Sequence, residues 1–418
     1  MQTSLPKRDL VLLGLGHTNA HILRMWRMAP LDGVRLTCVS DFGIATYSGM
    51  LPGTLAGLYP PGRMEIDLVR LCAAAGARLL RTEVTGLDVE GRQLLCQDRP
   101  AISFDALSIG IGSIPKGANR QADDAVVPIK PMQDFIRRLD KRLEVLECQA
   151  DARPIEIAIV GAGAGGIEIA CCLPAHLARH WPEVRFRLTV VDRGGRILPG
   201  AAARAVRLAR RLLAERGVEL LLDRSVDRVS SGELLFLDGS SRPVDLAIWA
   251  TGAAAPPLLT RLGLPHDEEG FLLTRPTLQT VAEAPIFVVG DSGTCPQHPR
   301  PKAGVYAVRQ GPVLWDNIQR MFRRQPLVEY RPQHGFLSLL ATGDRRAILS
   351  YKGLAAHAAW CWKLKDYIDG GFMDKHQDYR PQAMSGAAST QPRSVAPRCA
   401  GCGSKVGSSV LARVLKRL

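Results

Sequence analysis

The sequence predicts an α/β fold with two Rossmann-like dinucleotide-binding domains, the second inserted into a split first domain, and a small C-terminal α+β cap. Three observations predict it. Glycine fingerprints end two apolar, strand-like runs, an acidic residue ends the next strand in each case, and a third apolar run ends in Gly-Asp beyond the second fingerprint. Such glycines let the chain turn tightly after a strand and bring backbone N–H groups to a pyrophosphate. Two of them predict two bound dinucleotides.

The predicted elements follow one another in a consistent order. Residues 8 to about 115 alternate strand-like and helix-like segments, and 131–148 show the apolar spacing of a helix. Residues 155–252 form a second βαβ-rich unit, and 302–323 read as a helix. The predicted parts are a first domain at 1–125 and 273–330, an inserted domain with its lead-in helix at 126–272, the cap at 331–380, a Pro/Ser-rich linker at 381–398 and a tail at 399–418.

The first fingerprint predicts a flavin site. Its third glycine position holds Asn19, and a carboxylate at the end of a later parallel strand, Asp291, is well placed for a ribityl hydroxyl. The alternative is that Asp291 only caps the following turn. The candidate flavin-binding residues are Gly14, Gly16, Asn19, Asp41, Gly112, Gly290 and Asp291.

The second fingerprint predicts a nicotinamide site. Asp192 ends the strand that follows it, where a carboxylate accepts hydrogen bonds from a ribose 2′-OH, so NADH is favoured. Arg193 beside it is suited to a 2′-phosphate and leaves NADPH open, hence NAD(P)H. The candidate nicotinamide-binding residues are Gly161, Gly163, Gly166, Asp192 and Gly252.

Composition narrows the function classes. The net charge of +14 suits anionic ligands, but no nucleic-acid motif accompanies it, so we expect no nucleic acid as partner. Ten cysteines at irregular positions do not resemble an extracellular disulfide framework. No apolar run reaches the roughly 18 residues of a membrane span, and no secretory signal pattern is present. We therefore expect a cytoplasmic protein, with contact to the inner face of the membrane through the aromatic and basic stretch 358–368 as a further hypothesis.

Five motifs carry a family resemblance: YSGMLPGTLAGLYPP at 47–61, DALSIGIGSIP at 105–115, VGAGAGGIEIA at 160–170, VVGDSG at 288–293 and PKAGVYAVRQGP at 301–312. With them the first 380 residues resemble the pyridine nucleotide-disulfide oxidoreductase superfamily. The nearest members are type II NADH dehydrogenase-like flavoproteins of the subfamily fused ahead of selenophosphate synthetase (selenide, water dikinase). The resemblance implies FAD in the split domain, NAD(P)H in the inserted one, and hydride transfer between them.

The tail from Cys399 resembles the start of selenophosphate synthetase itself. In that family a cysteine or selenocysteine and a lysine three residues later are essential, and Cys402 and Lys405 fall on those positions. The segment is too short to hold the rest of such an enzyme, so we expect no synthetase activity from this chain alone, although a synthetase is a candidate partner. Half of a zinc site is the alternative for the cysteines, but no second pair lies nearby, and no metal is predicted.

Two residues are candidate catalytic groups. Glu168, shortly after the second fingerprint, either positions the nicotinamide and relays protons or is a first-turn carboxylate favoured by the helix dipole. Lys302 is a candidate for stabilising the charge of the reduced flavin, the alternative being an exposed lysine.

The sequence does not identify the electron acceptor, and three hypotheses remain. The segment FGIATYSGMLPG lacks the cysteine pair of the related disulfide reductases, which argues against a dithiol relay. The leading hypothesis is an FAD-dependent NAD(P)H dehydrogenase that reduces quinone or another small acceptor. The second is an oxidoreductase for sulfur or selenium compounds using a thiol such as Cys295 or Cys402. The third is a non-catalytic flavin-binding partner of a selenophosphate synthetase.

Overall fold

The computed structural model describes residues 6–118, 123–148 and 153–379. All of them fall within one compact unit, Met1–Pro381. The linker at 381–398 and the tail with Cys402 and Lys405 lie outside the described residues.

A five-stranded parallel sheet forms the first nucleotide-binding core, with strand order β21-β9-β1-β2-β5. The strands β1, β9 and β21 are mostly buried apolar runs, as expected for a parallel sheet covered on both faces, whereas the edge strand β5 is partly exposed. Strand β21 joins this sheet after the whole second sheet has been completed along the chain. The strands are β1 (Arg8–Leu13), β2 (Val34–Ser40), β5 (Arg78–Arg81), β9 (Ala106–Ile109) and β21 (Ile286–Val288).

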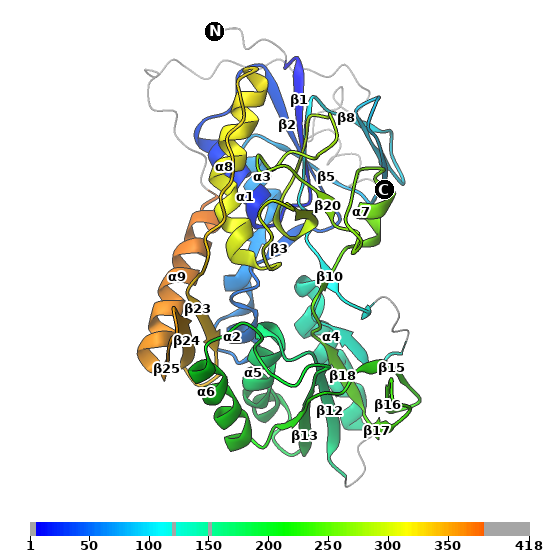
Figure 1. Ribbon diagram of the computed structural model, residues 1–418, viewed down its shortest axis with the longest axis vertical. Coiled ribbons are helices and arrows are strands. Elements are labelled where there is room, and N and C mark those ends of the chain that lie inside the picture. Colours follow the sequence, from blue (N-terminus) through cyan, green and yellow to red (C-terminus); the bar gives the residue numbers. More distant parts are fainter. Residues whose placement is uncertain (1–5, 119–122, 149–152, 380–418) are drawn as a thin grey trace, which may run out of the picture. The chain divides into compact units, whose positions relative to one another are not determined.

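Helices α1 (His17–Met28) and α8 (Gly304–Phe322) lie against one another beside this sheet (Figure 1). Trp26 and Trp315 meet edge to face between them, with ring centroids 6.4 Å apart. Through this contact α8, from the later part of the split first domain, packs on α1, the helix of the first fingerprint. The shorter helices near it are α2 (Leu51–Leu55), α3 (Leu68–Ala74) and the 3-10 helix Pro61–Met64.

A second five-stranded parallel sheet has the order β11-β18-β12-β13-β14. The helix predicted from 131–148 begins at Phe135, after a 3-10 turn at Met132–Asp134, and buries Phe135, Leu139, Leu143 and Leu146 as its spacing predicts. The strands are β11 (Val126–Pro128), β12 (Ile155–Val160), β13 (Phe186–Val191), β14 (Glu219–Leu221) and β18 (Leu246–Trp249); the helices are α4 (Phe135–Cys148), α5 (Ala164–His180) and α6 (Ala203–Glu215).

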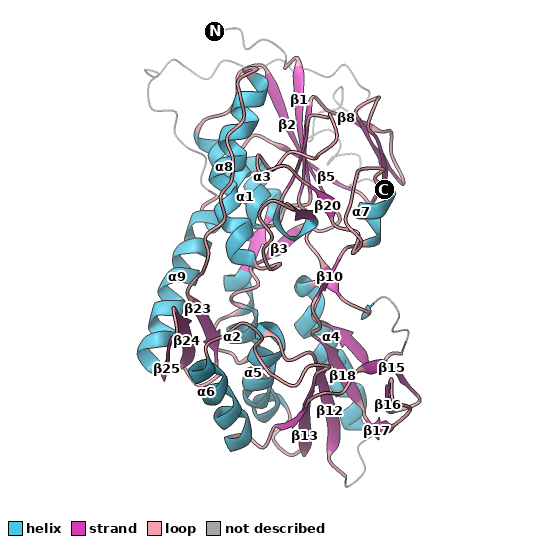
Figure 2. Cartoon of the chain, viewed as in Figure 1, coloured by secondary structure: helices cyan, strands magenta, loops and turns pink. Residues whose placement is uncertain are grey.

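Smaller sheets complete the described fold (Figure 2). Four of the antiparallel ones are β3–β4 (Ile44–Thr46, Glu65–Asp67), β6–β7–β8 (Val84–Asp88, Gln93–Cys96, Ile102–Ser103), β10–β19 (Ile114–Pro115, Ala253–Ala254) and β15–β16–β17 (Val226–Ser230, Glu233–Phe236, Ser241–Pro243). The pair β20–β22 (Leu272–Leu273, Gly293–Thr294) is parallel.

The segment that follows the second sheet along the chain packs on the first sheet. Helix α7 (Pro257–Arg261) and the residues after it bury Leu259, Leu262 and Phe271 in a cluster with Leu13 of β1. Residues 257–272, which the sequence assigns to the inserted domain, thus contribute to the core of the first one.

The C-terminal part is an antiparallel sheet followed by a long helix, as the predicted α+β cap requires. The strands β23 (Ser338–Ala341), β24 (Ala347–Tyr351) and β25 (Leu354–Ala358) precede α9 (Ala359–Gln377), which lies along them in Figure 1. Trp362 of α9 packs on Tyr59, with ring centroids 5.3 Å apart. Within the described ranges, no helix has both the length and the apolar composition that crossing a bilayer requires.

Candidate functional site

The first fingerprint makes a tight turn between β1 and α1. Gly14 has a φ of +76°, and a Cβ there would lie 2.7 Å from the carbonyl oxygen of Gly110. Gly16 is the N-cap of α1, and no side chain in the described part of the chain caps this helix. The first amides of α1 therefore remain available to an anion such as a pyrophosphate.

Asn19 explains how this turn works without a third glycine. Its buried Nδ2 donates to the Gly14 carbonyl oxygen at 2.7 Å, and its Oδ1 accepts from the Ser108 hydroxyl at 2.7 Å. A Cβ at Gly110 would lie 2.9 Å from Nδ2. The space that the fingerprint usually gains at its third glycine is thus provided by Gly110, just after the neighbouring strand β9, and Asn19 fills this space and forms hydrogen bonds there.

A cavity of about 280 Å³ opens at the carboxyl ends of β1, β9 and β21. This edge is where parallel α/β sheets bind ligands. Asp41 lies just after β2, is exposed, and is not among the lining residues. The cavity is lined by Gly16, His17, Thr18, Asn19, Thr46, Ser48, Gly110, Gly112, Lys130, Met132, Val289, Gly290, Asp291, Lys302, Ala303, Gly304 and Ala307.

Asp291 is held in this cavity by a serine and a lysine. The Ser113 hydroxyl donates to Asp291 Oδ2 at 2.8 Å, and Lys130 Nζ donates to the Ser113 hydroxyl at 2.8 Å while lying 3.6 Å from the same Oδ2. Among the described residues no donor reaches Asp291 Oδ1. One carboxylate oxygen is therefore fixed by the protein, and the other is free to accept from a ligand hydroxyl.

Lys302 lines the same cavity, but its ammonium group is directed to the protein. Nζ donates to the Gly293 carbonyl oxygen at 2.8 Å and to Thr294 Oγ1 at 2.9 Å, and it lies 3.8 Å from the centroid of the Phe271 ring. Burial lowers the pKa of Lys302 to about 8. These contacts suit a structural lysine at the entry to α8.

At two glycines of the second fingerprint, neighbouring backbone atoms lie too close to leave room for a side chain. Gly161 has a φ of +115°, and a Cβ there would overlap the Ala250 carbonyl oxygen; a Cβ at Gly166 would overlap the carbonyl oxygen of Gly161. Gly163, the N-cap of α5, and Gly252 after β18 face open space. The open face at the start of α5 is the counterpart of the first fingerprint's anion site.

Asp192 lies at the end of β13, against the fingerprint loop. Its Oδ2 accepts from the Ala162 N–H at 2.7 Å, and its Oδ1 accepts from the Gly194 N–H at 2.8 Å. Since a carboxylate oxygen can accept more than one hydrogen bond, both oxygens keep capacity for a ribose hydroxyl.

Glu168 lies where the fingerprint helix α5 meets the C-terminal sheet. Its Oε1 accepts from the Ala341 N–H of β23 at 2.8 Å. Burial raises the pKa of Glu168 to about 7, although nearby Lys365 opposes the rise. It does not line the cavity described above.

A buried polar network next to Glu168 was not predicted from the sequence. Lys365 Nζ lies 2.9 Å from Asp369 Oδ2 and donates to the Gly49 carbonyl oxygen at 2.8 Å, and the Tyr47 hydroxyl donates to Asp369 Oδ1 at 3.0 Å. Lys365 and Asp369 are each only 5% exposed. The available signal was an oppositely charged pair four residues apart on a helix, which a sequence alone does not distinguish from an exposed pair.

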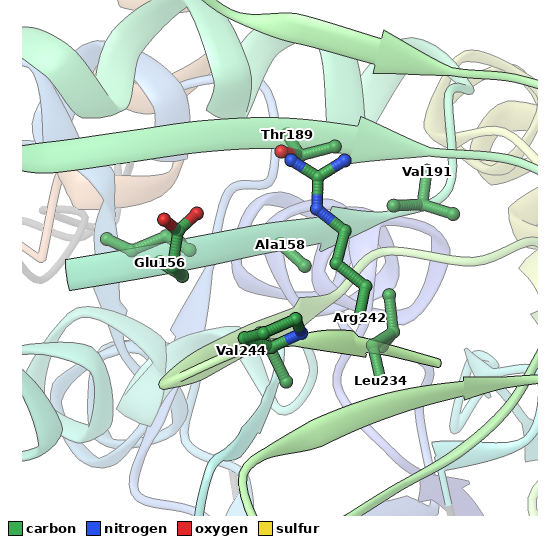
Figure 3. Close-up of a pocket in the computed structure, with 9 residues that line it drawn as sticks. Glu156, Ala158, Thr189, Val191, Leu234, Arg242 and Val244 are labelled. Carbon is green, nitrogen blue, oxygen red and sulfur yellow. The ribbon is translucent and has the colours of Figure 1, made fainter. Parts of the chain in front are cut away.

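Among the described residues, neither Cys295, nor a metal-ligating group, nor the pocket in Figure 3 offers a site. Cys295 is 4% exposed, and its thiol donates to Gln297 Oε1 at 3.3 Å. In the described ranges, no three or more His, Cys, Asp and Glu side chains gather where they would hold a metal ion. The pocket in Figure 3, between β12, β13 and the β16–β17 hairpin, encloses about 10 Å³, which is room for one water at most. We regard it as a packing gap.

Comparison with known proteins agrees with this geometry. Residues 9–311 match the family described as pyridine nucleotide-disulphide oxidoreductase. The demethylphylloquinone reductase NdbB of Synechocystis is 29% identical over 68% of this chain and 72% of its own length. The type II NADH:quinone oxidoreductase of Haemophilus influenzae is 27% identical over 58% of this chain and 61% of its own length.

Solved structures share the fold. The sulfide:quinone oxidoreductase of Aquifex aeolicus superposes with a TM-score of 0.74 at 16% identity, covering 90% of this chain and 92% of that one. NDH2 from Plasmodium falciparum in complex with NADH gives a TM-score of 0.71 at 13% identity, covering 90% and 100%. The predicted fold class is confirmed, and the family match confirms the predicted cofactors, FAD and NAD(P)H. The chain therefore belongs to the pyridine nucleotide-disulphide oxidoreductase family.

Proposed function

We propose that this protein is an FAD-dependent NAD(P)H oxidoreductase that passes electrons to a quinone. The observation that carries the proposal is the pair of fingerprints, each at the carboxyl edge of its own parallel sheet. The relatives named as quinone reductases support the choice of acceptor.

The flavin cavity fits FAD. Gly14 and Gly16 leave the backbone and the start of α1 bare for a diphosphate, and the free oxygen of Asp291 is placed to accept from a ribityl hydroxyl. Ala303 and Gly304, at the start of α8, bring that helix's N-terminus to the cavity, where its dipole favours negative charge. When bound, FAD accepts a hydride and releases electrons to the acceptor.

The second site fits a nicotinamide dinucleotide. The bare start of α5 at Gly163 takes the diphosphate, and Asp192 orients a ribose through its carboxylate. Because Asp192 is already fixed by two backbone amides, it presents its negative charge to the ribose and disfavours a 2′-phosphate. We therefore propose NADH as the preferred donor.

Glu168 is the proposed proton carrier. Reduction of a quinone takes up two electrons and two protons, whereas NADH supplies one hydride, so one further proton has to be delivered. A half-buried carboxyl with a pKa of about 7 holds and releases a proton near neutral pH. The adjacent Lys365 and Asp369 keep the surroundings of Glu168 polar.

The test compares acceptors under anaerobic NADH. We expect a short-chain quinone to be reduced faster than polysulfide or selenite, and NADH to be a better donor than NADPH. The thiol hypothesis receives little support from the described residues, because Cys295 is buried. Cys295→Ser should therefore leave quinone reduction unchanged; preferential turnover of a sulfur or selenium compound that this variant loses would overturn the proposal.

We also propose contact with an anionic membrane surface, where quinones reside. Exposed large apolar side chains occur along β24, β25 and α9, and the exposed lysines 352 and 363 lie in the same stretch of the chain. Such a mixture binds the interface of a bilayer. The exposed fractions are Tyr351 40%, Leu354 69%, Trp360 55%, Tyr367 80% and Ile368 43%.

Co-sedimentation with anionic vesicles tests this contact. The double variant Trp360→Ser, Tyr367→Ser should bind several-fold less, whereas Leu237→Ser, an exposed leucine of another region, should bind as the parent does. Equal binding by all three proteins would contradict the proposal. We propose the cytoplasmic face of the membrane as the place of this contact.

A selenophosphate synthetase is the proposed protein partner. The support is the likeness of the tail, with Cys402 and Lys405, to the start of that enzyme. Mixing this protein with a separate synthetase should give a complex that size-exclusion chromatography detects. No complex, and no effect of either protein on the other's activity, would refute this partner.

A further inference from the structure

Lys130 links the two nucleotide-binding sheets. It follows β11, the edge strand of the second sheet, yet its side chain lines the cavity at the carboxyl edge of the first sheet. No motif in the sequence singles it out. A cation from the nicotinamide domain thus lies in the flavin cavity.

The contacts of Lys130 leave part of its ammonium group unused. Of its three N–H donors, one reaches the Ser113 hydroxyl at 2.8 Å, and Asp291 Oδ2 lies 3.6 Å away. The side chain is 27% exposed. No backbone carbonyl among the described residues accepts from Nζ, so at least one donor is free towards the cavity.

The two other basic side chains that line the cavity, Lys302 and His17, do not present a positive charge to its open space. Lys302 donates to Gly293 and Thr294 and lies over Phe271, so its charge is directed to the protein. His17 is neutral at pH 7, because burial lowers its pKa to about 4. Among the residues that line the cavity, Lys130 is therefore the cation whose charge faces the open space.

We propose that Lys130 makes the cavity bind reduced FAD more tightly than oxidised FAD. Two-electron reduction leaves negative charge on the flavin at neutral pH, and a partly buried ammonium stabilises that charge more than it stabilises the neutral ring. The inference rests on FAD occupying this cavity, as proposed above, and does not depend on the identity of the acceptor.

A structural role for Lys130 makes a different prediction. If the lysine only holds Asp291 in place, its loss weakens oxidised and reduced FAD alike and leaves the reduction potential of the bound flavin unchanged. If it acts by charge, its loss weakens the reduced form alone, and the ratio of the two dissociation constants changes. The potential measures that ratio directly, because tenfold corresponds to about 30 mV for a two-electron couple.

The test compares Lys130→Gln with Lys130→Arg in the FAD-loaded protein. We expect Lys130→Gln to shift the ratio about tenfold in favour of oxidised FAD, which lowers the potential by about 30 mV, and Lys130→Arg to stay within about twofold of the parent. The dissociation constant of oxidised FAD is measured on the apoprotein, and the potential by equilibration with a reference dye. Lys116→Gln, at an exposed lysine paired with Glu269, is the matched control.

Ser113→Ala separates charge from hydrogen bonding, since it removes a partner of Lys130 and keeps the ammonium. We expect its potential to match that of the parent. Lys130→Met is the second neutral variant, should the glutamine protein fold poorly. An unchanged reduction potential in both neutral variants would overturn the role of Lys130. So would a fall in the potential of Ser113→Ala as large as that of Lys130→Gln. A parent protein that binds no FAD would instead refute the proposed function, and with it this inference.

Discussion

Replacement of Glu168 by glutamine should change how stability depends on pH. Burial raises the pKa of Glu168 from its ordinary 4.5 to about 7 in the folded protein. A carboxyl group with a raised folded pKa stabilises the fold fully at a pH below its unfolded value, and this contribution is lost as the pH rises through the folded pKa. The window of the effect is therefore about pH 4.5 to 7.

The magnitude follows from the two pKa values. At about 1.4 kcal/mol per pKa unit, the full effect of the rise from 4.5 to about 7 is about 3.5 kcal/mol. Because Glu168 is only half-buried, we expect about 1–2 kcal/mol after screening by solvent. Glutamine keeps an oxygen that accepts from the Ala341 N–H and removes the charge.

The assay is denaturant unfolding of the parent protein and Glu168→Gln at pH 5 and pH 8. From pH 5 to pH 8, the free energy of unfolding of the variant should rise by about 1–2 kcal/mol relative to that of the parent. Glu215→Gln, at an exposed glutamate paired with Arg211, is the control and should show no such gain. The same pH dependence in both variants would refute a raised pKa at Glu168.

Four further substitutions test the fingerprints. Gly166→Ala should destabilise the protein by about 1–3 kcal/mol, because its Cβ overlaps a backbone oxygen, whereas Gly163→Ala faces open space and should cost under about 1 kcal/mol; thermal unfolding compares them. Asn19→Ala should cost about 2–3 kcal/mol in the same measurement, since it leaves the Gly14 carbonyl and a buried serine hydroxyl without partners. Asp192→Ala should raise the KM for NADH about tenfold and affect NADPH less; equal effects on both would contradict its role at the ribose.

The sequence predicted the features that depend on neighbouring residues. The glycine turns, the apolar strands and the spacing of Phe135, Leu139 and Leu143 in α4 are local patterns, and the structure has them. The start of α4 was less predictable, because the 3-10 turn at Met132–Asp134 continues the helical pattern of the sequence.

Features that depend on long-range contacts could not be predicted. Lys130 lies far along the chain from Asp291, and nothing around it in the sequence indicates that they meet. Lys365 and Asp369 look like an exposed helical pair, and only the packing of α9 shows that they are buried. In the same way, the sequence does not show that Gly110 provides the space that Asn19 occupies at the third position of the fingerprint.

The most direct test of the central claim is an anaerobic titration of the FAD-loaded protein with NADH, followed by addition of a quinone. We predict that one equivalent of NADH bleaches the visible absorption of the oxidised flavin and that the quinone restores it. A bound flavin that NADH does not bleach, or that remains reduced after the quinone is added, would contradict the account.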